Sequence, residues 1–267
     1  MVGAASQDMV DAWLARLGLA GDLPVSLDSL TRIIRAHLDR IPFENLTVFC
    51  GGVPDVGVEA LSNKILHQRR GGYCVELNPL LCDGLRVLGF DARLRMARVM
   101  WQRDVPGPRS HCLCLVRLDR ADYLVDVGFG GPGPTGPFLL GSETLDLRIQ
   151  IRTGLGTVLS RQVSEGDWRD LYAFTDEVTT MSDVQAGNWL AATLPGSLFT
   201  RTLVVTRQTA DSRLVLDGAT FRKFAKGRAL EVEVLQTPEA VMSCLHDAFD
   251  LDPPSELPDA MSNKGIF

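Results

Sequence analysis

Apolar side chains recur at intervals of three to four residues along the first third of the chain, a spacing that predicts helices with one buried face. The first helix is expected to have Asp8 as its N-cap and Gly18 as its C-terminal stop. A later helix is expected to end just before Gly89. The four expected helices cover residues 8–18, 28–41, 58–68 and 74–88.

From residue 91 onward the pattern changes, because apolar and polar side chains then alternate as they do in strands. Two apolar runs are separated by the turn-like residues 119–122, which predicts a hairpin. Another tight turn is expected at Asp217 and Gly218, inside an antiparallel meander. The expected strands cover residues 92–96, 112–118, 123–127, 145–152, 201–207, 212–216, 219–224 and 229–235.

Two more helices are expected in the last third of the chain, at residues 184–194 and 238–249. The second of them has Thr237 as its cap and Pro238 at its first position. The elements therefore follow the order helices, then strands, then strands with a helix. This order favours an α+β fold over an alternation of βαβ units.

Composition narrows the functional classes. The 267 residues, 45% of them hydrophobic, are enough for one large domain or two to three small ones. Acidic and basic residues are interspersed and give a net charge of −6, without the basic tract of a nucleic-acid-binding protein. Neither a signal peptide nor an apolar stretch of about 18 residues occurs. We therefore expect no nucleic-acid partner, no membrane insertion and a cytoplasmic location.

The six cysteines are too sparse for a disulfide scaffold, and a reducing compartment would keep them as thiols. His111, Cys112 and Cys114 lie close enough in the sequence to raise the question of a metal site. Alternation along a strand would put the two cysteines on one face and the histidine on the other, and no second ligand pair of zinc spacing occurs. No metal is expected, and both cysteines are expected in the core.

Cys74 follows two glycines at the point where a helix is expected to begin. A thiol there lies at the positive end of the helix dipole, beside unsatisfied backbone N–H groups, and both favour the thiolate. Gly71 and Gly72 would let a substrate carbonyl approach backbone N–H groups that can hold an oxyanion. Cys74 is therefore the candidate nucleophile, and the competing interpretation is a small buried side chain.

A cysteine nucleophile usually needs a base, and the chain has four histidines. His37 lies on the apolar stripe of a helix, where we expect a buried, hydrogen-bonding role. His67 and His246 lie in polar surroundings and are expected to be exposed. His111 opens a strand directly after a loop, where its side chain could meet a helix N-terminus from another layer.

Asp126 interrupts an apolar strand that follows His111 in the chain. A carboxylate there is costly to bury without a partner, and His111 on a neighbouring strand could supply one. Cys74, His111 and Asp126 would then act as nucleophile, base and orienting carboxylate. The competing interpretation of Asp126 is a water-facing residue on an edge strand.

Several motifs in this order resemble those of the arylamine N-acetyltransferases. They are IPFEN from Ile41 to Asn45, RGGxCxELN from Arg70 to Asn78, the isolated His111, DVGFG from Asp126 to Gly130, and NW…SLF from Asn188 to Phe199. The resemblance implies an N-terminal helical bundle, a central β-barrel and a C-terminal α/β lid around a cysteine-protease-like core. These regions would cover residues 1–89, 90–190 and 191–267.

The resemblance also implies a two-step exchange. The cysteine would take an acetyl group from acetyl-CoA, which is a substrate and not a tightly bound cofactor, and give it to a small aromatic amine or hydrazine. A homodimer is a further expectation. By motif position, the acceptor pocket would be lined by Phe43, Val99, Phe129 and Phe199, and CoA would contact the loop at Gly107 and Pro108. The competing interpretation of the four pocket residues is ordinary core.

Two features depart from the family's usual pattern. The segment NWLAATLPGS lacks the polar His-Pro-Asp often found there, and six cysteines are more than expected. One alternative is an amide synthase of the same family, which would release a polyketide chain as an aryl amide or macrolactam. Another is a papain-like or transglutaminase-like cysteine hydrolase, although aromatic residues near the proposed pocket favour a transferase that excludes water. A non-catalytic binding module would leave Cys74 and Asp126 without a reason.

Overall fold

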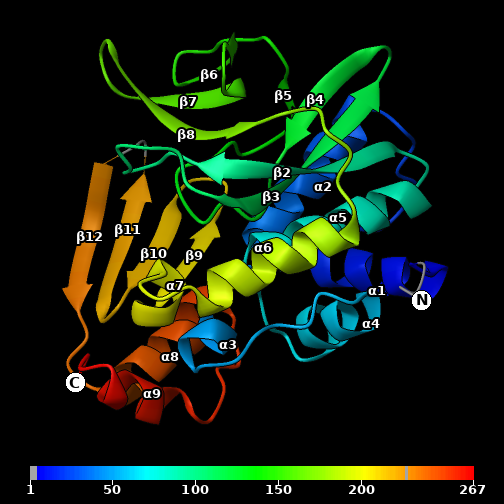
Figure 1. Ribbon diagram of the computed structural model, residues 1–267. Coiled ribbons are helices and arrows are strands. Elements are labelled where there is room, and N and C mark those ends of the chain that lie inside the picture. The colour runs from blue at the N-terminus through cyan, green and yellow to red at the C-terminus, as the bar shows by residue number, and fades with distance from the viewer. Residues whose placement is uncertain (1–4, 226–227) are drawn as a thin grey trace.

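The computed structural model describes residues 5–225 and 228–267. Its N-terminal region is a group of helices packed around α5 (Cys74–Val87), which is buried along most of its length (Figure 1). The helix α1 contacts both α2 and α5, and their apolar faces share one core. The surrounding helices are α1 (Gln7–Leu17), α2 (Leu27–Arg40), α4 (Val58–Leu61) and the π-helix η1 (Ser62–His67).

Two of these helices differ from the sequence prediction. The helix α1 begins at Gln7 because the Ser6 hydroxyl accepts a hydrogen bond from the Met9 N–H, so Ser6 is its N-cap and Asp8 lies in the first turn. It ends at Gly18, as predicted, with a positive φ of 69°. The single helix predicted at residues 58–68 is instead α4 followed by η1.

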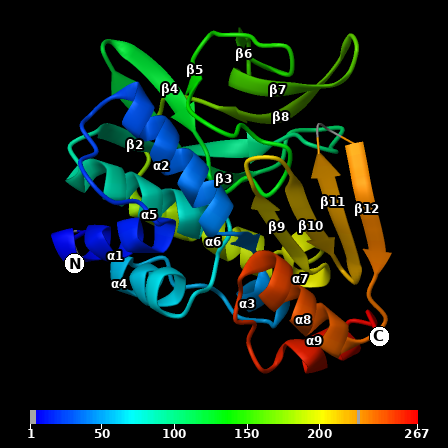
Figure 2. The same ribbon diagram turned by 180° about the vertical axis from the view of Figure 1, so that it is seen from behind.

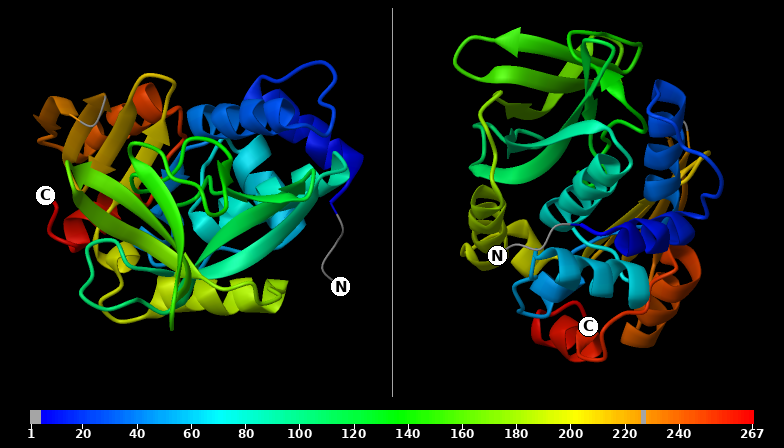
Figure 3. Two further views of the ribbon diagram at one scale, coloured as in Figure 1. Left: turned by 90° about the horizontal axis from the view of Figure 1, so that it is seen from above. Right: turned by 90° about the vertical axis from the view of Figure 1, so that its right-hand side faces the viewer.

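The central region is an antiparallel sheet with the strand order β5-β4-β3-β2-β8-β7-β6. It curls so that β6, β7 and β8 arch over β2 and β3 (Figures 1 and 3). A closed barrel was expected, but among the described residues β5 and β6 are the free edges, so the sheet is a half-barrel. Its strands are β2 (Asp91–Val99), β3 (Arg109–Leu118), β4 (Ala121–Val125), β5 (Phe138–Leu139), β6 (Leu147–Arg152), β7 (Gly156–Ser164) and β8 (Asp167–Phe174).

The alternation rule found some of these strands and missed others. The predicted hairpin is present as β3 and β4, but its turn contains only Asp119 and Arg120, which have φ values of 46° and 69°. The strands β7 and β8 were not predicted, because shifts in register after Leu159 and Gln162 interrupt their alternation. The strand predicted at residues 145–152 begins only at Leu147. Leu147 and Ile149 are buried as expected, whereas Leu145 and Ile151 of the same alternating pattern are exposed, so the prediction of one buried face is wrong at its two ends.

The C-terminal region is a second antiparallel sheet, with the order β1-β9-β10-β11-β12. The helix α8 covers one face of it, with α9 beyond (Figure 2). The tight turn between β10 and β11 is at Gly218 and Ala219, one residue later than predicted, because Asp217 still pairs with Thr220. These elements are β9 (Val204–Gln208), β10 (Arg213–Asp217), β11 (Thr220–Ala225), β12 (Arg228–Val234), α8 (Pro238–Phe249) and α9 (Leu257–Asn263).

Short segments connect the three regions. The edge strand β1 (Phe43–Glu44) and helix α3 (Leu46–Phe49) come from the N-terminal part of the chain but pack with the C-terminal sheet and its core. The helix α6 (Met181–Thr193) lies against α5 and β3 and leads into α7 (Leu198–Arg201). None of the described helices combines the length and the apolar character needed to cross a membrane.

Three histidines can be compared with their expectations at this level. His67 and His246 are exposed, as predicted. His37 is completely buried, but neither of its ring nitrogens has a hydrogen-bond partner among the described residues. The predicted hydrogen-bonding role is therefore wrong. Its ring instead packs edge-on against Trp13, with centroids 6.2 Å apart.

Candidate active site

Cys74 is the first residue of α5 and is 5% exposed. The Glu76 carboxylate caps this end of the helix by accepting a hydrogen bond from the Tyr73 N–H at 3.2 Å. Gly71, two residues before Tyr73, has no room for a side chain, because a Cβ there would lie 2.0 Å from the Pro42 carbonyl oxygen. The chain therefore enters α5 tightly packed against the strand that begins at Phe43.

His111 and Asp126 come together beside this helix start. His111 Nε2 lies 2.7 Å from Asp126 Oδ2, and both side chains are buried. The Cys74 thiol lies 3.7 Å from the carbonyl oxygen of Ser110, the residue before His111. Because Nε2 is bonded to the carboxylate, Nδ1 is the ring nitrogen that remains for a contact with the thiol.

Asn78 connects the helix to the carboxylate, a contact that the sequence interpretation missed. Its amide donates to Asp126 Oδ1 at 2.9 Å and to the Cys112 carbonyl at 2.7 Å, and its side-chain oxygen accepts from the Val127 N–H at 3.1 Å. The available signal was its position four residues after Cys74, which puts both side chains on one face of the helix.

Asp126 lies just beyond the end of β4, and not inside a strand as expected. It therefore has no ladder partner on either side and is held by side chains and by the Gly128 N–H, which donates to it at 2.9 Å. A Cβ on Gly128 would lie 2.6 Å from the Cys74 Cα. Only glycine lets this loop approach the start of α5 so closely.

The electrostatics of the pair depend on its partners more than on its burial. Burial would lower the pKa of His111, but the negative charges of Asp126 and Cys74 outweigh it and raise the pKa to about 10. Burial would likewise raise the pKa of Asp126, but His111, the Asn78 amide and the Gly128 N–H lower it. The site therefore favours the imidazolium form of His111 beside an ionised Asp126.

A buried ion network lies directly behind the helix start. Glu44 accepts hydrogen bonds from Arg70 at 2.9 Å and from the Leu46 N–H at 2.6 Å, and the Lys64 ammonium lies 3.5 Å from it. Lys64 also donates to Glu76 at 2.6 Å. The network joins the IPFEN and RGGxCxELN segments, whose charged residues had received no role from the sequence.

Aromatic rings surround the histidine and the entrance to the site. Phe129 and Tyr172 lie against the His111 ring, with centroid distances of 5.5 Å and 4.9 Å. Phe199 packs between Phe43 and Tyr73, at 5.9 Å and 5.6 Å. Tyr172 was missed because it lies on β8, a strand that the alternation pattern did not reveal.

The four predicted pocket residues do not all line one cavity. A pocket of about 420 Å³, counted with its opening to solvent, lies between the end of α2, the loop after Asp126 and the strands β9 and β10. We call it the lid pocket. Phe43 and Phe129 line it, together with Asp126, whereas Val99 and Phe199 do not.

Two residues were predicted to contact CoA, and the backbone of one of them, Gly107, is already hydrogen-bonded within the protein. Gly107 is buried, its N–H donates to the Val99 carbonyl at 2.9 Å, and its own carbonyl accepts from Arg98 at 3.1 Å. Pro108 is exposed. A ligand at this loop would therefore meet Pro108 and neighbouring side chains, and not the backbone of Gly107.

Comparisons with known proteins agree with this architecture. A family model described as N-acetyltransferase matches residues 26–256. An arylamine N-acetyltransferase of Mycolicibacterium smegmatis is 38% identical over 253 residues, which cover 90% of each chain. The structure of the Salmonella typhimurium arylamine N-acetyltransferase superposes with a TM-score of 0.90 at 29% identity, over 97% of this chain and 100% of the other. The Mycobacterium marinum arylamine N-acetyltransferase, solved in complex with CoA, has a TM-score of 0.86 at 32% identity, over 95% and 98% of the chains.

Proposed function

The chain belongs to the arylamine N-acetyltransferase family, and from this premise we propose that it moves an acetyl group from acetyl-CoA to an arylamine or arylhydrazine nitrogen through a thioester on Cys74. The observation that carries the mechanism is the arrangement of Cys74 at a helix start with the buried His111–Asp126 pair beside it. The relative solved with CoA supports the choice of donor.

In the first half-reaction, the Cys74 thiolate attacks the thioester carbonyl of acetyl-CoA. A carbon–sulfur bond forms to Cys74, the bond to CoA breaks, and the CoA sulfur leaves with the proton from the His111 imidazolium. The N–H groups of Glu76 and Leu77 donate to the Tyr73 carbonyl at 2.9 Å and 3.0 Å. The N–H groups of Cys74 and Val75 at the start of α5 are therefore the ones that can hold the oxyanion that forms in between.

In the second half-reaction, the amine attacks the acetyl-cysteine. His111, now neutral, takes the proton from the amine nitrogen while the Cys74 thiolate leaves. Asp126 and Asn78 keep the imidazole in one orientation throughout, since Asp126 binds Nε2 and Asn78 holds the carboxylate. This juxtaposition of a helix-borne cysteine and a sheet-borne histidine is also the basis for assigning a cysteine-protease-like core.

For the substrates, we assign Phe43 and Phe129 to the acceptor pocket because both line the lid pocket. Phe199, in contact with Phe43, and Val99, at the end of β2, would complete its approach. Pro108 and the adjacent Gly107 would lie along the CoA path. These apolar side chains would limit the access of water to the thioester and would admit a flat aromatic amine.

The test is to isolate the acetyl-enzyme. With acetyl-CoA and no amine, intact-mass spectrometry should show the protein heavier by one acetyl group, and the Cys74→Ala variant should show no gain. An arylamine should remove the acetyl group quickly and water slowly. Initial-rate plots at several fixed amine concentrations should give parallel lines, because CoA leaves before the amine reacts.

A Cys82→Ala variant is the matched control, since it removes another buried cysteine of the same helix. It should load acetyl as the parent protein does. Intersecting rate plots, or an acetyl group on a lysine, would contradict the mechanism. Loading by an aryl-polyketide thioester but not by acetyl-CoA would indicate the amide synthase instead.

A further inference from the structure

The lid pocket contains an arginine that has no hydrogen-bond or ion-pair partner among the described residues. The Arg213 guanidinium lies in the pocket wall and makes no hydrogen bond or ion pair with any residue that the structure describes. Its one notable contact is with the Phe224 ring, whose centroid lies 5.0 Å from the guanidinium carbon. A half-buried guanidinium without a carboxylate is unusual, because the lost hydration is normally compensated by an anion.

The sheet register points Arg213 toward the same space as Phe43. Phe43 pairs with Thr206, Thr206 pairs with Val215, and Arg213 is two residues from Val215 on the same face of β10. At the usual strand spacing and rise, the Cα atoms of Phe43 and Arg213 are about 12 Å apart. The Phe43 ring and an extended Arg213 side chain are together long enough to meet across that distance.

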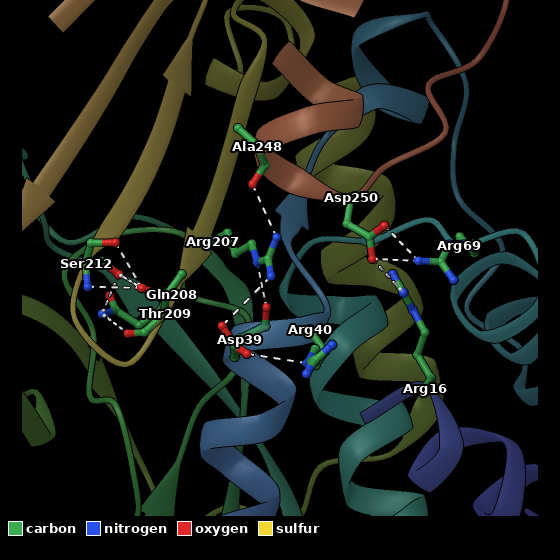
Figure 4. A network of polar contacts seen from close by, with 10 residues as sticks. All are labelled: Arg16, Asp39, Arg40, Arg69, Arg207, Gln208, Thr209, Ser212, Ala248 and Asp250. Carbon is green, nitrogen blue, oxygen red and sulfur yellow. Dashed lines mark hydrogen bonds and ion pairs between the residues drawn. The ribbon is translucent and has the colours of Figure 1, made fainter. Parts of the chain in front are cut away.

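The wall that carries Arg213 is held in place by its surroundings (Figure 4). Arg207, on the preceding strand, donates to the Asp39 carbonyl of α2 at 2.6 Å and to the Ala248 carbonyl of α8 at 3.3 Å. The turn before Arg213 is closed by the Thr209 and Ser212 hydroxyls, which lie 2.9 Å apart. Arg213 is thus presented from a fixed turn.

A second arginine, Arg161, lies behind the opposite wall of the pocket and, unlike Arg213, is paired with a carboxylate, that of Asp146 at 2.8 Å. Arg161 donates to the Pro132 and Gly133 carbonyls at 2.7 Å and 3.2 Å, which fixes the loop that forms the opposite wall. Burial lowers the pKa of Arg213 and the charge of Arg161 lowers it further, while no carboxylate opposes them. An anion bound beside Arg213 would compensate the hydration that this guanidinium has lost.

We propose that Arg213 selects acceptors that carry a carboxylate, so that the preferred substrates are aromatic amines with an anionic group on the ring, opposite the amino group. This inference rests on the proposed function. The amine would lie toward Phe129 and the acyl-transfer centre, and the carboxylate would accept the two parallel hydrogen bonds that a guanidinium offers. The other anions available to the enzyme are the phosphates of CoA, and the experiment separates the two sources.

The test compares two acceptors of the same shape, 4-aminobenzoate and the neutral 4-aminobenzamide, in the parent protein and in Arg213→Gln. The parent protein should have a higher kcat/KM for 4-aminobenzoate than for 4-aminobenzamide. Arg213→Gln should reduce that preference at least tenfold, with less than a twofold change for the amide. Arg213→Lys, which keeps the charge but not the two-pronged geometry, should retain part of the preference. Loading of Cys74 by acetyl-CoA should be unchanged.

Arg222→Gln is the matched control, because Arg222 lies on the neighbouring strand, faces Asp217 at 3.7 Å and does not line the pocket. It should leave the preference within twofold of the parent. If Arg213→Gln lowered kcat/KM equally for both acceptors, the arginine would only support Phe224. Slower loading by acetyl-CoA with an unchanged preference would assign the anion to the donor. Either result overturns the proposal, as does a parent protein without preference.

A binding measurement keeps the proposal testable if acetyl transfer itself is not observed. In the Cys74→Ala protein, calorimetry should show that adding Arg213→Gln weakens the binding of 4-aminobenzoate at least tenfold and leaves that of 4-aminobenzamide unchanged. Absence of transfer to both amines would refute the proposed function only. Unchanged affinity for 4-aminobenzoate would refute the role of Arg213 only.

Discussion

Two histidines of this protein are equally buried and have opposite electrostatic behaviour. His111, in β3 beside the start of α5, has its pKa raised to about 10, whereas His37, in α2 and facing α1, has its pKa lowered to about 3. Burial acts in the same direction on both, because it penalises the charged ring. The difference comes from their neighbours, since His111 faces Asp126 and His37 faces the positive Arg16.

The two rings also differ in the hydrogen bonding of the polar groups around them. Around His111, Asp126 is bonded to the ring itself and accepts hydrogen bonds from two further groups, the Asn78 amide and the Gly128 N–H, so the carboxylate of the pair is held on several sides. Around His37, several buried polar atoms lack partners among the described residues, namely both of its ring nitrogens, the Trp13 indole nitrogen and two nitrogens of Arg16. The first region is organised for charge, and the second is an apolar core that tolerates polar atoms.

The largest expected effect separates the two histidines by activity. We predict that His111→Gln lowers acetyl transfer by a factor on the order of a thousand or more, because the proposed base is removed. His37→Gln should keep activity within about threefold, since it lies outside the site. Asp126→Asn should resemble His111→Gln. The measurement is the rate of CoA release with a saturating arylamine, with circular dichroism to confirm folding.

If Asp126→Asn kept more than a tenth of the activity, the carboxylate would be structural only. If His37→Gln were as damaged as His111→Gln while remaining folded, the contrast between the two regions would fail as an account of function.

An intermediate effect concerns stability at high pH. Because folding raises the pKa of His111, its stabilising contribution is complete below about pH 6.5 and is lost as the pH rises through about 10. We predict that His111→Gln lowers the free energy of unfolding by about 3 kcal/mol near pH 6.5. The deficit should shrink as the pH approaches 10. Urea unfolding of both proteins across this range is the measurement, and a deficit that grows with pH would contradict it.

The smallest effect is expected at His37. His37→Leu should change the free energy of unfolding by less than about 1 kcal/mol at pH 7.5, because no hydrogen bond is lost. Below about pH 6.5 the unfolded chain binds a proton that buried His37 does not, so the parent should lose stability relative to the variant as the pH falls toward about 3.

Thermal unfolding between pH 4 and 7.5 measures this difference. His67→Leu, at an exposed position, is the control and should follow the parent protein throughout. A His37→Leu variant that is strongly destabilised at pH 7.5 would show that the ring has a partner after all.

The helices and the order of the elements were accessible from the sequence, because their signals are local. The last long helix has the predicted bounds, with Thr237 as cap and Pro238 at its first position. The interrupted strands β7 and β8 gave no such signal, and β1 could not be assigned to the C-terminal sheet because its pairing with Thr206 is remote in sequence. A half-barrel and a closed barrel also have the same alternation, since closure depends on how the edges meet.

The sequence by itself was enough to name the residues that we propose as carriers of the chemistry. A cysteine after two glycines at a helix start, a histidine at a strand start and an aspartate after an apolar run could each be named from their neighbours. Only the tertiary structure decided what surrounds them: the Asn78 contact to Asp126, the ring of Tyr172 beside His111, and the lid pocket into which Arg213 is brought. The reason is physical, because a helix cap or an apolar period is set within a few residues, whereas a hydrogen bond, a pKa or a pocket depends on groups that are distant in the chain.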